Sequence, residues 1–144
     1  MATAAEFAHG TLLKLGNGGA PETFATIAEV SDLKPPQIHQ EALEATSHDS
    51  TDGWKEFVGG LLDAGEVTLT VNFLPTHATH SYSAGLIKDA VNRTKRNFQL
   101  VFPDAGGTTW TFAALVTAFE PNAPVDGLLT ADVTLTVSGK PTLA

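Results

Sequence analysis

The segment GEVTLTVNF (65–73) alternates apolar and polar residues with a period of two. Its apolar positions are Val67, Leu69, Val71 and Phe73, and its polar positions are Glu66, Thr68, Thr70 and Asn72. The segment TADVTLTVSG (130–139) repeats the pattern, with Val133, Leu135 and Val137 alternating against Asp132, Thr134, Thr136 and Ser138. Successive side chains of a strand point to opposite faces, so both segments predict strands with one buried and one solvated face.

Further strands are expected on either side of these two segments. TTWTFAALVTAF (108–119) predicts a longer strand that is more apolar on both faces, and NFQLVF (97–102) predicts a strand that ends before Pro103. DAGG (104–107) joins the two as a four-residue hairpin loop. Two N-terminal strands are also expected, GTLLKL (10–15) and TFATIAEV (23–30), separated by the glycine-rich turn GNGGAP (16–21).

One segment has a different period. In SYSAGLIKDAVNR (81–93) the apolar residues have helical spacing, Ser81 is a suitable N-cap and basic residues follow at the end. The chain of 144 residues is long enough for one domain, 1–144, with a single core. We therefore expect a mainly β fold, a β-sandwich or barrel-like domain that carries one α-helix at about 81–93.

Residues 31–63 interrupt the alternation and are predicted to form a long, irregular excursion. Pro35 and Pro36 favour extended backbone, 37–46 is interpreted as an extended strand, and 48–53 is rich in turn-forming residues. A loop of this length in a compact domain is usually functional or disordered. The aromatic and aliphatic side chains that follow the turn argue against disorder, namely Trp54, Phe57 and Val58.

Composition excludes several classes of function. The chain has no cysteine, which removes disulfides, thiolate zinc sites and cysteine nucleophiles. Its formal charge is −8, which opposes binding to phosphate backbones, and no stretch is long and apolar enough to predict a membrane-spanning helix. A local basic group is interpreted as the complement of a helix C-terminal dipole and comprises Lys88, Arg93, Lys95 and Arg96.

No convincing catalytic or metal site is present. Ser47, His48 and Asp49 are the residue types of a hydrolase triad, but consecutive residues cannot place the histidine between the other two. His77 and His80 are spaced for a shared metal, yet the nearest acidic residue in sequence is Asp89, and a polar lead-in to the helix explains them better. We expect no enzymatic activity, no metal and no cofactor.

Three stretches resemble the tail tube protein (major tail protein) family of long-tailed, lambda-like bacteriophages, whose relatives also occur in prophages and gene transfer agents. They are GTLLKLGNGGAPETFATIAEVSDL (10–33), HDSTDGWKEFVGGLLDAGEVTLTVNF (48–73) and FPDAGGTTWTFAALVTAFEPNAPVDGLLTADVTLTVSGKPTL (102–143). The most specific pieces are HDSTDGW followed by DAGEV, and FEP followed by APVDGLLTADVTLTVSGKP. The likeness covers nearly the whole chain, in order.

The resemblance implies a structural protein of the virion tail, assembled in the host bacterial cytoplasm. In this family six copies form a ring, and rings stack into a tube through which DNA passes during ejection without sequence-specific binding. The implied partners are further copies of the chain, the tape measure protein, and the tail tip and tail terminator proteins. If each of six subunits gave about four strands, with ~4.8 Å between strands and a tilt near 40°, the cylinder would be roughly 48 Å across.

Two sets of residues are expected to act in assembly. The first is an arm at about 35–60 that packs on a neighbouring subunit, with candidate residues Ile38, Glu41, Glu44, His48, Asp49, Trp54 and Phe57. The second is a polar and acidic lumen lining that repels phosphates, with candidate residues Glu66, Thr68, Thr70, Asp132, Thr134 and Thr136.

Alternatives stay open for both sets. Strand faces follow parity, so a register error of one residue would move the lumen candidates to the outer surface. Trp54 could instead fold back on its own domain. A further alternative for the whole chain is a β-sandwich module that binds a ligand or carbohydrate through exposed aromatics, for which Trp54, Trp110 and Tyr82 are the available side chains.

Overall fold

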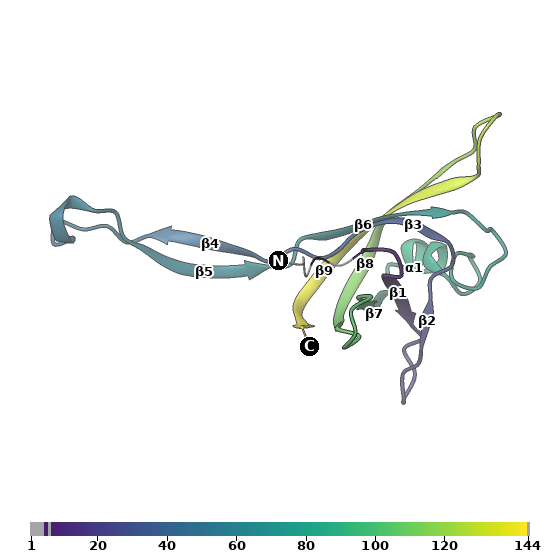
Figure 1. Ribbon diagram of the computed structural model, residues 1–144, viewed down its shortest axis with the longest axis horizontal. Coiled ribbons are helices and arrows are strands. Elements are labelled where there is room, and N and C mark those ends of the chain that lie inside the picture. The colour runs from purple at the N-terminus through teal and green to yellow at the C-terminus, as the bar shows by residue number, and fades with distance from the viewer. Residues whose placement is uncertain (1–4, 6, 144) are drawn as a thin grey trace.

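The computed structural model describes residue 5 and residues 7–143, and it contains a curled seven-stranded antiparallel sheet (Figure 1). The strand order is β2-β1-β7-β8-β9-β6-β3. The strands are β1 (Leu12–Gly16), β2 (Phe24–Thr26), β3 (Val30–Lys34), β6 (Glu66–Asn72), β7 (Lys95–Val101), β8 (Thr109–Asn122) and β9 (Thr130–Leu143). The prediction of a mainly β fold with one helix is confirmed.

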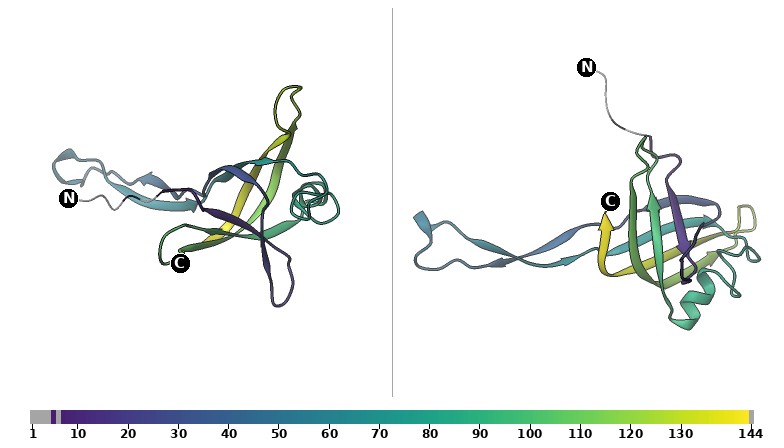
Figure 2. Two further views of the ribbon diagram at one scale, coloured as in Figure 1. Left: turned by 45° about the vertical axis from the view of Figure 1, so that its right-hand side comes forward. Right: turned by 90° about the horizontal axis from the view of Figure 1, so that it is seen from below.

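A separate two-stranded hairpin projects from one end of the sheet (Figures 1 and 2). Its strands are β4 (His39–Glu44) and β5 (Phe57–Asp63), joined through a short 3₁₀ turn, η1 (Thr51–Gly53). The extended strand expected at 37–46 is therefore present. The prediction of an irregular excursion was wrong, because 57–63 returns as a strand that pairs with β4.

The core lies on one face of the sheet. Val67, Leu69 and Val71 of β6 are buried, and their partners across the β6–β9 ladder are also buried. Other large members of this core come from β1, β7, β8, α1 (Leu86–Asn92) and the turn between β2 and β3, namely Leu13, Leu15, Phe98, Leu100, Phe112, Val116, Leu86 and Ile27. The alternation in 65–73 and 130–139 thus identified the buried face correctly.

Strands β8 and β9 are longer than their sequence patterns predicted. Each has 14 residues, and they pair from Trp110 and Leu143 at one end to Asn122 and Thr130 at the other. The ladder contains two bulges, between Thr111/Ala113 and Val116/Ala118. Past Leu115, β8 pairs only with β9, and past Thr136, β9 pairs only with β8. The turn between the two strands, at 123–129, forms a second projection at the far end of the ladder (Figure 1).

The strand predicted at 23–30 is divided into β2 and β3. Ile27 is buried and its N–H donates to Leu13 O at 2.9 Å, while Glu29 adopts the left-handed region with φ 52°. Because β2 pairs with β1 and β3 pairs with β6, this turn carries the chain from one edge of the sheet to the other. The period-two pattern cannot reveal such a transfer, since both halves remain extended.

The helix is shorter than predicted. It begins at Leu86 and ends at Asn92, and the residues from His77 to Gly85 form turns. Gly85, not Ser81, is the N-cap, and a Cβ at position 85 would lie 2.4 Å from the Thr79 carbonyl carbon. The interpretation of the basic group was also wrong, because the last turn contains no basic residue and two of the four, Lys95 and Arg96, lie in β7.

None of the helices described is long and apolar enough to cross a membrane.

Candidate functional site

The hairpin β4–β5 is the part of the described chain with the least coverage by other elements. All six residues of β4 are exposed, and in β5 only Gly60 is partly covered. Both strands pair with each other and with no strand of the seven-stranded sheet. Isolated two-stranded hairpins are marginally stable in water, so an element of this kind is normally covered by something else.

Apolar side chains occur on both faces of the hairpin. Leu43 lies opposite Val58 on one face, and Phe57 lies opposite Glu44 on the other, followed by Leu62 opposite Gln40. Leu43, Val58 and Phe57 are 49%, 57% and 59% exposed. A hairpin that met a partner on one face only would leave half of this surface in water, so the arrangement favours burial on both sides.

Trp54 lies just after η1, at the end of the hairpin. Its side chain is 74% exposed, which contradicts the alternative in which Trp54 folds back on its own domain. The other arm candidates are exposed as well: Ile38, Glu41, Glu44, His48, Asp49 and Phe57. An exposed tryptophan surrounded by polar turn residues is typical of an interaction surface rather than of a core.

The turn that holds Ser47, His48 and Asp49 has no catalytic geometry. Ser47 Oγ accepts a hydrogen bond from the Asp49 backbone N–H at 3.3 Å, and the Ser50 N–H donates to Ser47 O at 3.1 Å. Ser50 Oγ donates in turn to Glu56 Oε2 at 2.6 Å. These bonds close the turn of the hairpin, as the turn-forming composition predicted.

The six lumen candidates lie on one face of the sheet. They form three directly opposed pairs across the β6–β9 ladder: Glu66 with Thr136, Thr68 with Thr134, and Thr70 with Asp132. Thr70 Oγ1 donates to Asp132 Oδ1 at 2.9 Å. The residues between them are buried, so this face points away from the core of the same chain.

Strand pairing adds residues to this face that the sequence reasoning missed. Asp32 and Lys34 of β3 lie opposite Thr70 and Thr68. Lys95 lies opposite Leu115, which in turn lies opposite Thr136. The half carried by β3, β6 and β9 is therefore mainly acidic, whereas the β1–β7 half carries Lys14 and Lys95. Only the register of the strands reveals this, because β3 has no clean alternation in sequence.

His80 is a buried structural histidine. Its Nδ1 accepts the Leu74 N–H at 3.1 Å, so its Nε2 carries the proton and donates to Ala28 O at 2.9 Å. Burial lowers the pKa of His80 below its usual value of 6.5, opposed by the bond to Ala28. Together with Thr79 Oγ1, which accepts the Ala28 N–H, it fastens the loop before α1 to the β2–β3 turn.

No metal centre is formed in the part of the chain that the structure describes. The rings of His77 and His80 lie 5.7 Å apart, but no cluster of three metal-binding side chains is found among the described residues. His80 uses both ring nitrogens for backbone groups, which leaves no lone pair for a metal. Asp89, the third candidate, is occupied by an ion pair.

The ion pair between Asp89 and Arg96 joins three elements. Asp89 of α1 is 1% exposed, and its Oδ1 accepts a hydrogen bond from an Arg96 terminal nitrogen at 2.9 Å. Arg96 of β7 also donates from Nε to the Gly16 carbonyl of β1 at 2.9 Å. Burial raises the pKa of Asp89, and the guanidinium opposes that shift. Single acidic residues placed in this way hold elements together and do not constitute an active site.

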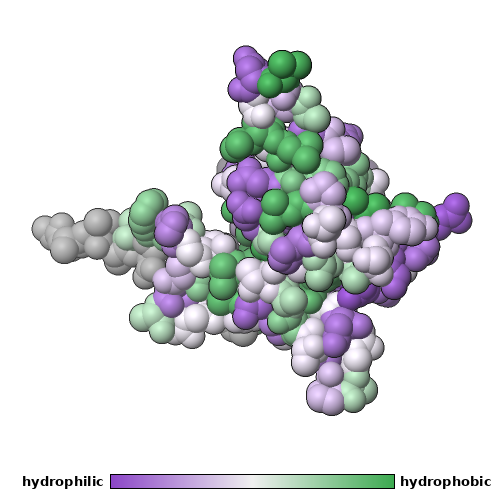
Figure 3. All heavy atoms as spheres, turned by 90° about the vertical axis from the view of Figure 1, so that its right-hand side faces the viewer, coloured by the Kyte–Doolittle hydropathy of each residue, from purple (hydrophilic) through white to green (hydrophobic). Residues whose placement is uncertain are grey.

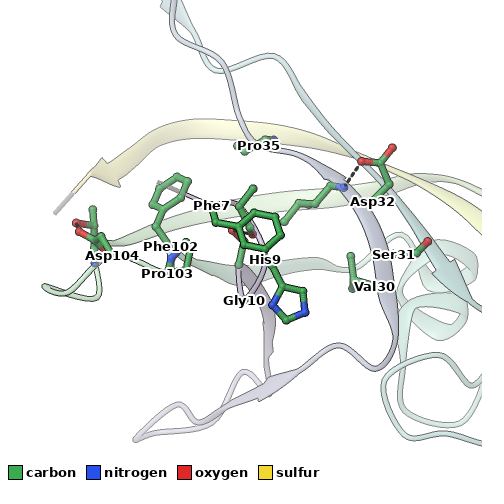
Figure 4. A pocket seen from close by; sticks show the side chains of 14 residues that line it. Phe7, His9, Gly10, Val30, Ser31, Asp32, Pro35, Phe102, Pro103 and Asp104 are labelled. Atoms are coloured by element: carbon green, nitrogen blue, oxygen red, sulfur yellow. Dashed lines mark hydrogen bonds between the residues drawn. The ribbon is translucent and has the colours of Figure 1, made fainter. Parts of the chain in front are cut away.

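A surface pocket of about 730 Å³ lies between the N-terminal segment, β3 and the β7–β8 turn (Figure 4). Phe7 and His9 stack at 5.8 Å between ring centroids, and the pocket wall includes Phe102 and Pro103. Its carboxylate Asp104 accepts hydrogen bonds from the Thr108 side chain and backbone, which lower the pKa of Asp104. These bonds close the β7–β8 turn, so Asp104 has a structural role at the pocket.

The family model of the lambda phage tail tube protein, TTP, matches residues 8–144. The chain belongs to this family. The match includes the hairpin, the polar face and the β8–β9 projection, so all the surfaces described above are parts of a tail tube protein. A comparison with curated protein sequences found no significant match.

Solved tail structures share the tail tube fold. A chain from the tail of an empty GTA particle, refined with C6 symmetry, has a TM-score of 0.79 at 20% identity, covering 97% of this chain and 99% of that chain. A chain from the virion of a native gene transfer agent has a TM-score of 0.76 at 19% identity, with the same coverage. The SPP1 tail tube has a TM-score of 0.66 at 13% identity, covering 93% of this chain and 77% of that one.

The protein is therefore a structural subunit of a phage-type tail tube and not an enzyme. The alternative of a carbohydrate-binding module would need several aromatic side chains on one surface, and the three available ones are separated. Trp110 is partly buried and packs edge-on against Phe102 at 5.0 Å, whereas Trp54 lies on the hairpin and Tyr82 precedes α1. Aromatic side chains from three separate elements do not form one flat binding face.

Proposed function

We propose that six copies of this tail tube protein form a ring, and that rings stack into a hollow tube through which DNA passes. The observation that carries the proposal is the hairpin β4–β5, which exposes Trp54 and apolar side chains on both faces. A lone subunit leaves this surface in water. An assembly in which each hairpin lies between neighbouring copies removes it from water.

The polar face of β6 and β9 is the proposed lumen lining. Threonine hydroxyls and carboxylates give this face a polar character toward a passing duplex, and the acidic half of the face repels phosphates. This charge arrangement supports sliding of DNA rather than retention. The gene transfer agent tail that shares the fold was refined with C6 symmetry, which supports a ring of six in this chain as well.

The other proposed partners are proteins that occupy the interior of a tail tube or close its two ends. We place the tape measure protein in the lumen before DNA passage, and the tail tip and tail terminator proteins at the two ends. Chains that share the fold also come from the baseplate of the anti-feeding prophage and from a sheath/tube terminator of an extracellular contractile injection system, which supports contacts of this kind.

Negative-stain electron microscopy of the purified protein tests the assembly. We expect rings or tubes with an axial hole, formed from subunits that sediment as monomers when dilute. Monomers under every condition, at concentrations where related assemblies form tubes, would contradict the proposal.

Trp54→Ala tests the role of the arm. The variant should fold and stay soluble, because the side chain is 74% exposed, and it should not form tubes. Tyr82→Ala is the matched control, since Tyr82 is a comparably exposed aromatic outside the hairpin, and it should assemble normally. If Trp54→Ala formed normal tubes, the proposed role of the arm in assembly would be wrong.

A further inference from the structure

An apolar hollow of about 460 Å³ lies beside α1, at the end of the sheet away from the hairpin. Its lining includes Ile87 and Val91 of α1, Phe119 and Pro121 of β8, and Phe73. Val91 is 57% exposed, and the Phe73 and Phe119 rings meet edge-on at 5.3 Å. The hollow is thus lined by packed apolar side chains and is partly open to solvent.

The apolar surface continues from the hollow onto the β8–β9 projection. The Phe73 N–H donates to Leu129 O at 2.8 Å, which places the base of the projection against the hollow. At the tip of the projection, the Val125 side chain is fully exposed and the Leu128 side chain is 72% exposed. Figure 3, which faces this end of the molecule, shows apolar side chains on the upper projection and on the face beneath it.

Two basic residues lie on α1 next to the hollow, outside the set of residues that line it. Lys88 neighbours Val91 on the helix surface, and Arg93 caps the helix; both are exposed. The adjacent Asp89 does not offset their charge toward solvent, because it is buried and paired with Arg96. Of the predicted basic group, Arg96 is used within the subunit, whereas neither Lys88 nor Arg93 forms a salt bridge with any of the described residues.

The hairpin has the complementary character. Residues 37–63 contain six carboxylates and one lysine, a net charge of −5 with histidines neutral. The carboxylates are Glu41, Glu44, Asp49, Asp52, Glu56 and Asp63. The hairpin therefore exposes two aromatic side chains, Trp54 and Phe57, among acidic residues. The hollow is apolar, with Lys88 and Arg93 beside it on α1 and Glu120 beside it on β8.

The two surfaces lie at opposite ends of the subunit. Figure 1 shows the hairpin at one end of the longest axis, and α1 and the β8–β9 projection at the other. A subunit with this layout cannot bring its own hairpin to its own hollow. Contact between different surfaces of two copies is heterologous, and repetition of such a contact gives rings or open tubes rather than closed dimers.

We propose that the α1–β8 hollow is the docking site for the β4–β5 hairpin of a second copy of this chain. The inference rests on the proposed function, and it assigns the surface that receives the arm. Trp54 and Phe57 enter the apolar hollow and the base of the β8–β9 projection. Glu44 and Asp49 face Lys88 and Arg93.

Cross-linking tests the docking site directly, because the chain has no cysteine of its own. Hairpin variants Asp49→Cys, Thr51→Cys and Lys55→Cys are each mixed with a Val91→Cys variant and oxidised after assembly. Disulfides form only where the two Cα atoms come within about 7 Å, and three hairpin positions allow for an unfavourable angle at any one of them. We expect covalent dimers between the two variants in tubes and none in dilute monomers.

Ala105→Cys provides the matched control. Ala105 is exposed in the β7–β8 turn, outside the hollow, and should give no dimer with any hairpin variant. Tubes with no cross-link to Val91→Cys, or with cross-links to Ala105→Cys instead, overturn the docking site and leave the proposed function intact. Failure of the unmodified protein to form any ring or tube counts against the proposed function itself.

A charge-reversal pair tests the charged contact separately. Lys88→Glu on α1 and Glu44→Lys in the hairpin should each cause a loss of tubes, because each places like charges together. The double variant Lys88→Glu with Glu44→Lys should recover them, since the pairing is restored with opposite polarity. Loss in both single variants without recovery in the double variant would contradict the proposed contact, as would normal assembly of either single variant.

Discussion

The strands β6 and β9 and the strands β4 and β5 are both antiparallel pairs, but they differ in what covers them. On β6 and on β9 as far as Val137, every second side chain is buried in the subunit, and the other face is polar. On β4 and β5 no residue is buried, and apolar side chains lie on both faces. The difference fits the proposed assembly, in which the sheet carries the stability of the subunit and the hairpin supplies surface for contacts between copies.

The largest expected effect is the loss of a core aromatic from the sheet. Phe98 is fully buried and stacks on Phe112 at 5.8 Å between ring centroids. Phe98→Ala should lower the free energy of unfolding by about 3–5 kcal/mol, through lost burial and the cavity left behind. Phe57→Ala, in the hairpin, should change it by less than about 0.5 kcal/mol. Urea unfolding of dilute monomers measures both, and equal losses would erase the distinction between the two regions.

The ion pair that joins α1 to the sheet should be next in effect. Arg96→Met leaves Asp89 buried without a cation, which should cost about 3 kcal/mol of unfolding free energy. Adding Asp89→Leu to that variant should recover much of the loss, because no unpaired charge remains. Lys88→Met removes an exposed cation from the same helix and serves as the control. If the double variant were no more stable than Arg96→Met, an unpaired carboxylate would not be the cause of the loss.

The buried His80 should make the free energy of unfolding depend on pH. Burial lowers its pKa in the folded state, so between that lowered value and 6.5 the unfolded chain binds a proton that the folded chain does not. The free energy of unfolding should therefore fall as pH falls below 6.5, by up to about 1.4 kcal/mol per pH unit from this group. His80→Gln should lose that slope, although it is also less stable. His48→Gln, on the hairpin, should retain it, and an unchanged slope in His80→Gln would exclude His80 as its source.

The sheet could be predicted from the sequence wherever burial alternates. Val67, Leu69 and Val133 identified the core face because each strand there has one wet face and one dry face. The same logic placed all lumen candidates on one surface, and the family resemblance gave the fold. The sequence showed that Lys88 and Arg93 belong to a local basic group. Their proposed contact with the hairpin of another copy could not be predicted, because it depends on which surfaces lie at opposite ends of the molecule.

Three features could not be predicted because no local pattern encodes them. Strand β5 contains Gly59 and Gly60 and lacks alternation, since neither of its faces meets a core. The late start of α1 follows from a close approach of Gly85 to Thr79, which is a tertiary contact. The division of β2 from β3 depends on the turn at Glu29, whose left-handed backbone allows the chain to change edges.

Removing the hairpin altogether should also have only a small effect on subunit stability. The Gln37 N–H donates to Ala64 O at 3.1 Å, so the two ends of the hairpin are adjacent and a two-residue Asn-Gly turn can join them in place of 38–63. The shortened chain should unfold within about 1 kcal/mol of the full chain, because closing a shorter loop costs slightly less entropy and no core residue is lost. It should also remain monomeric at concentrations where the full chain forms tubes, as sedimentation would show. A large loss of stability would mean that the hairpin supports the sheet, and the separation of the two regions would then have to be abandoned.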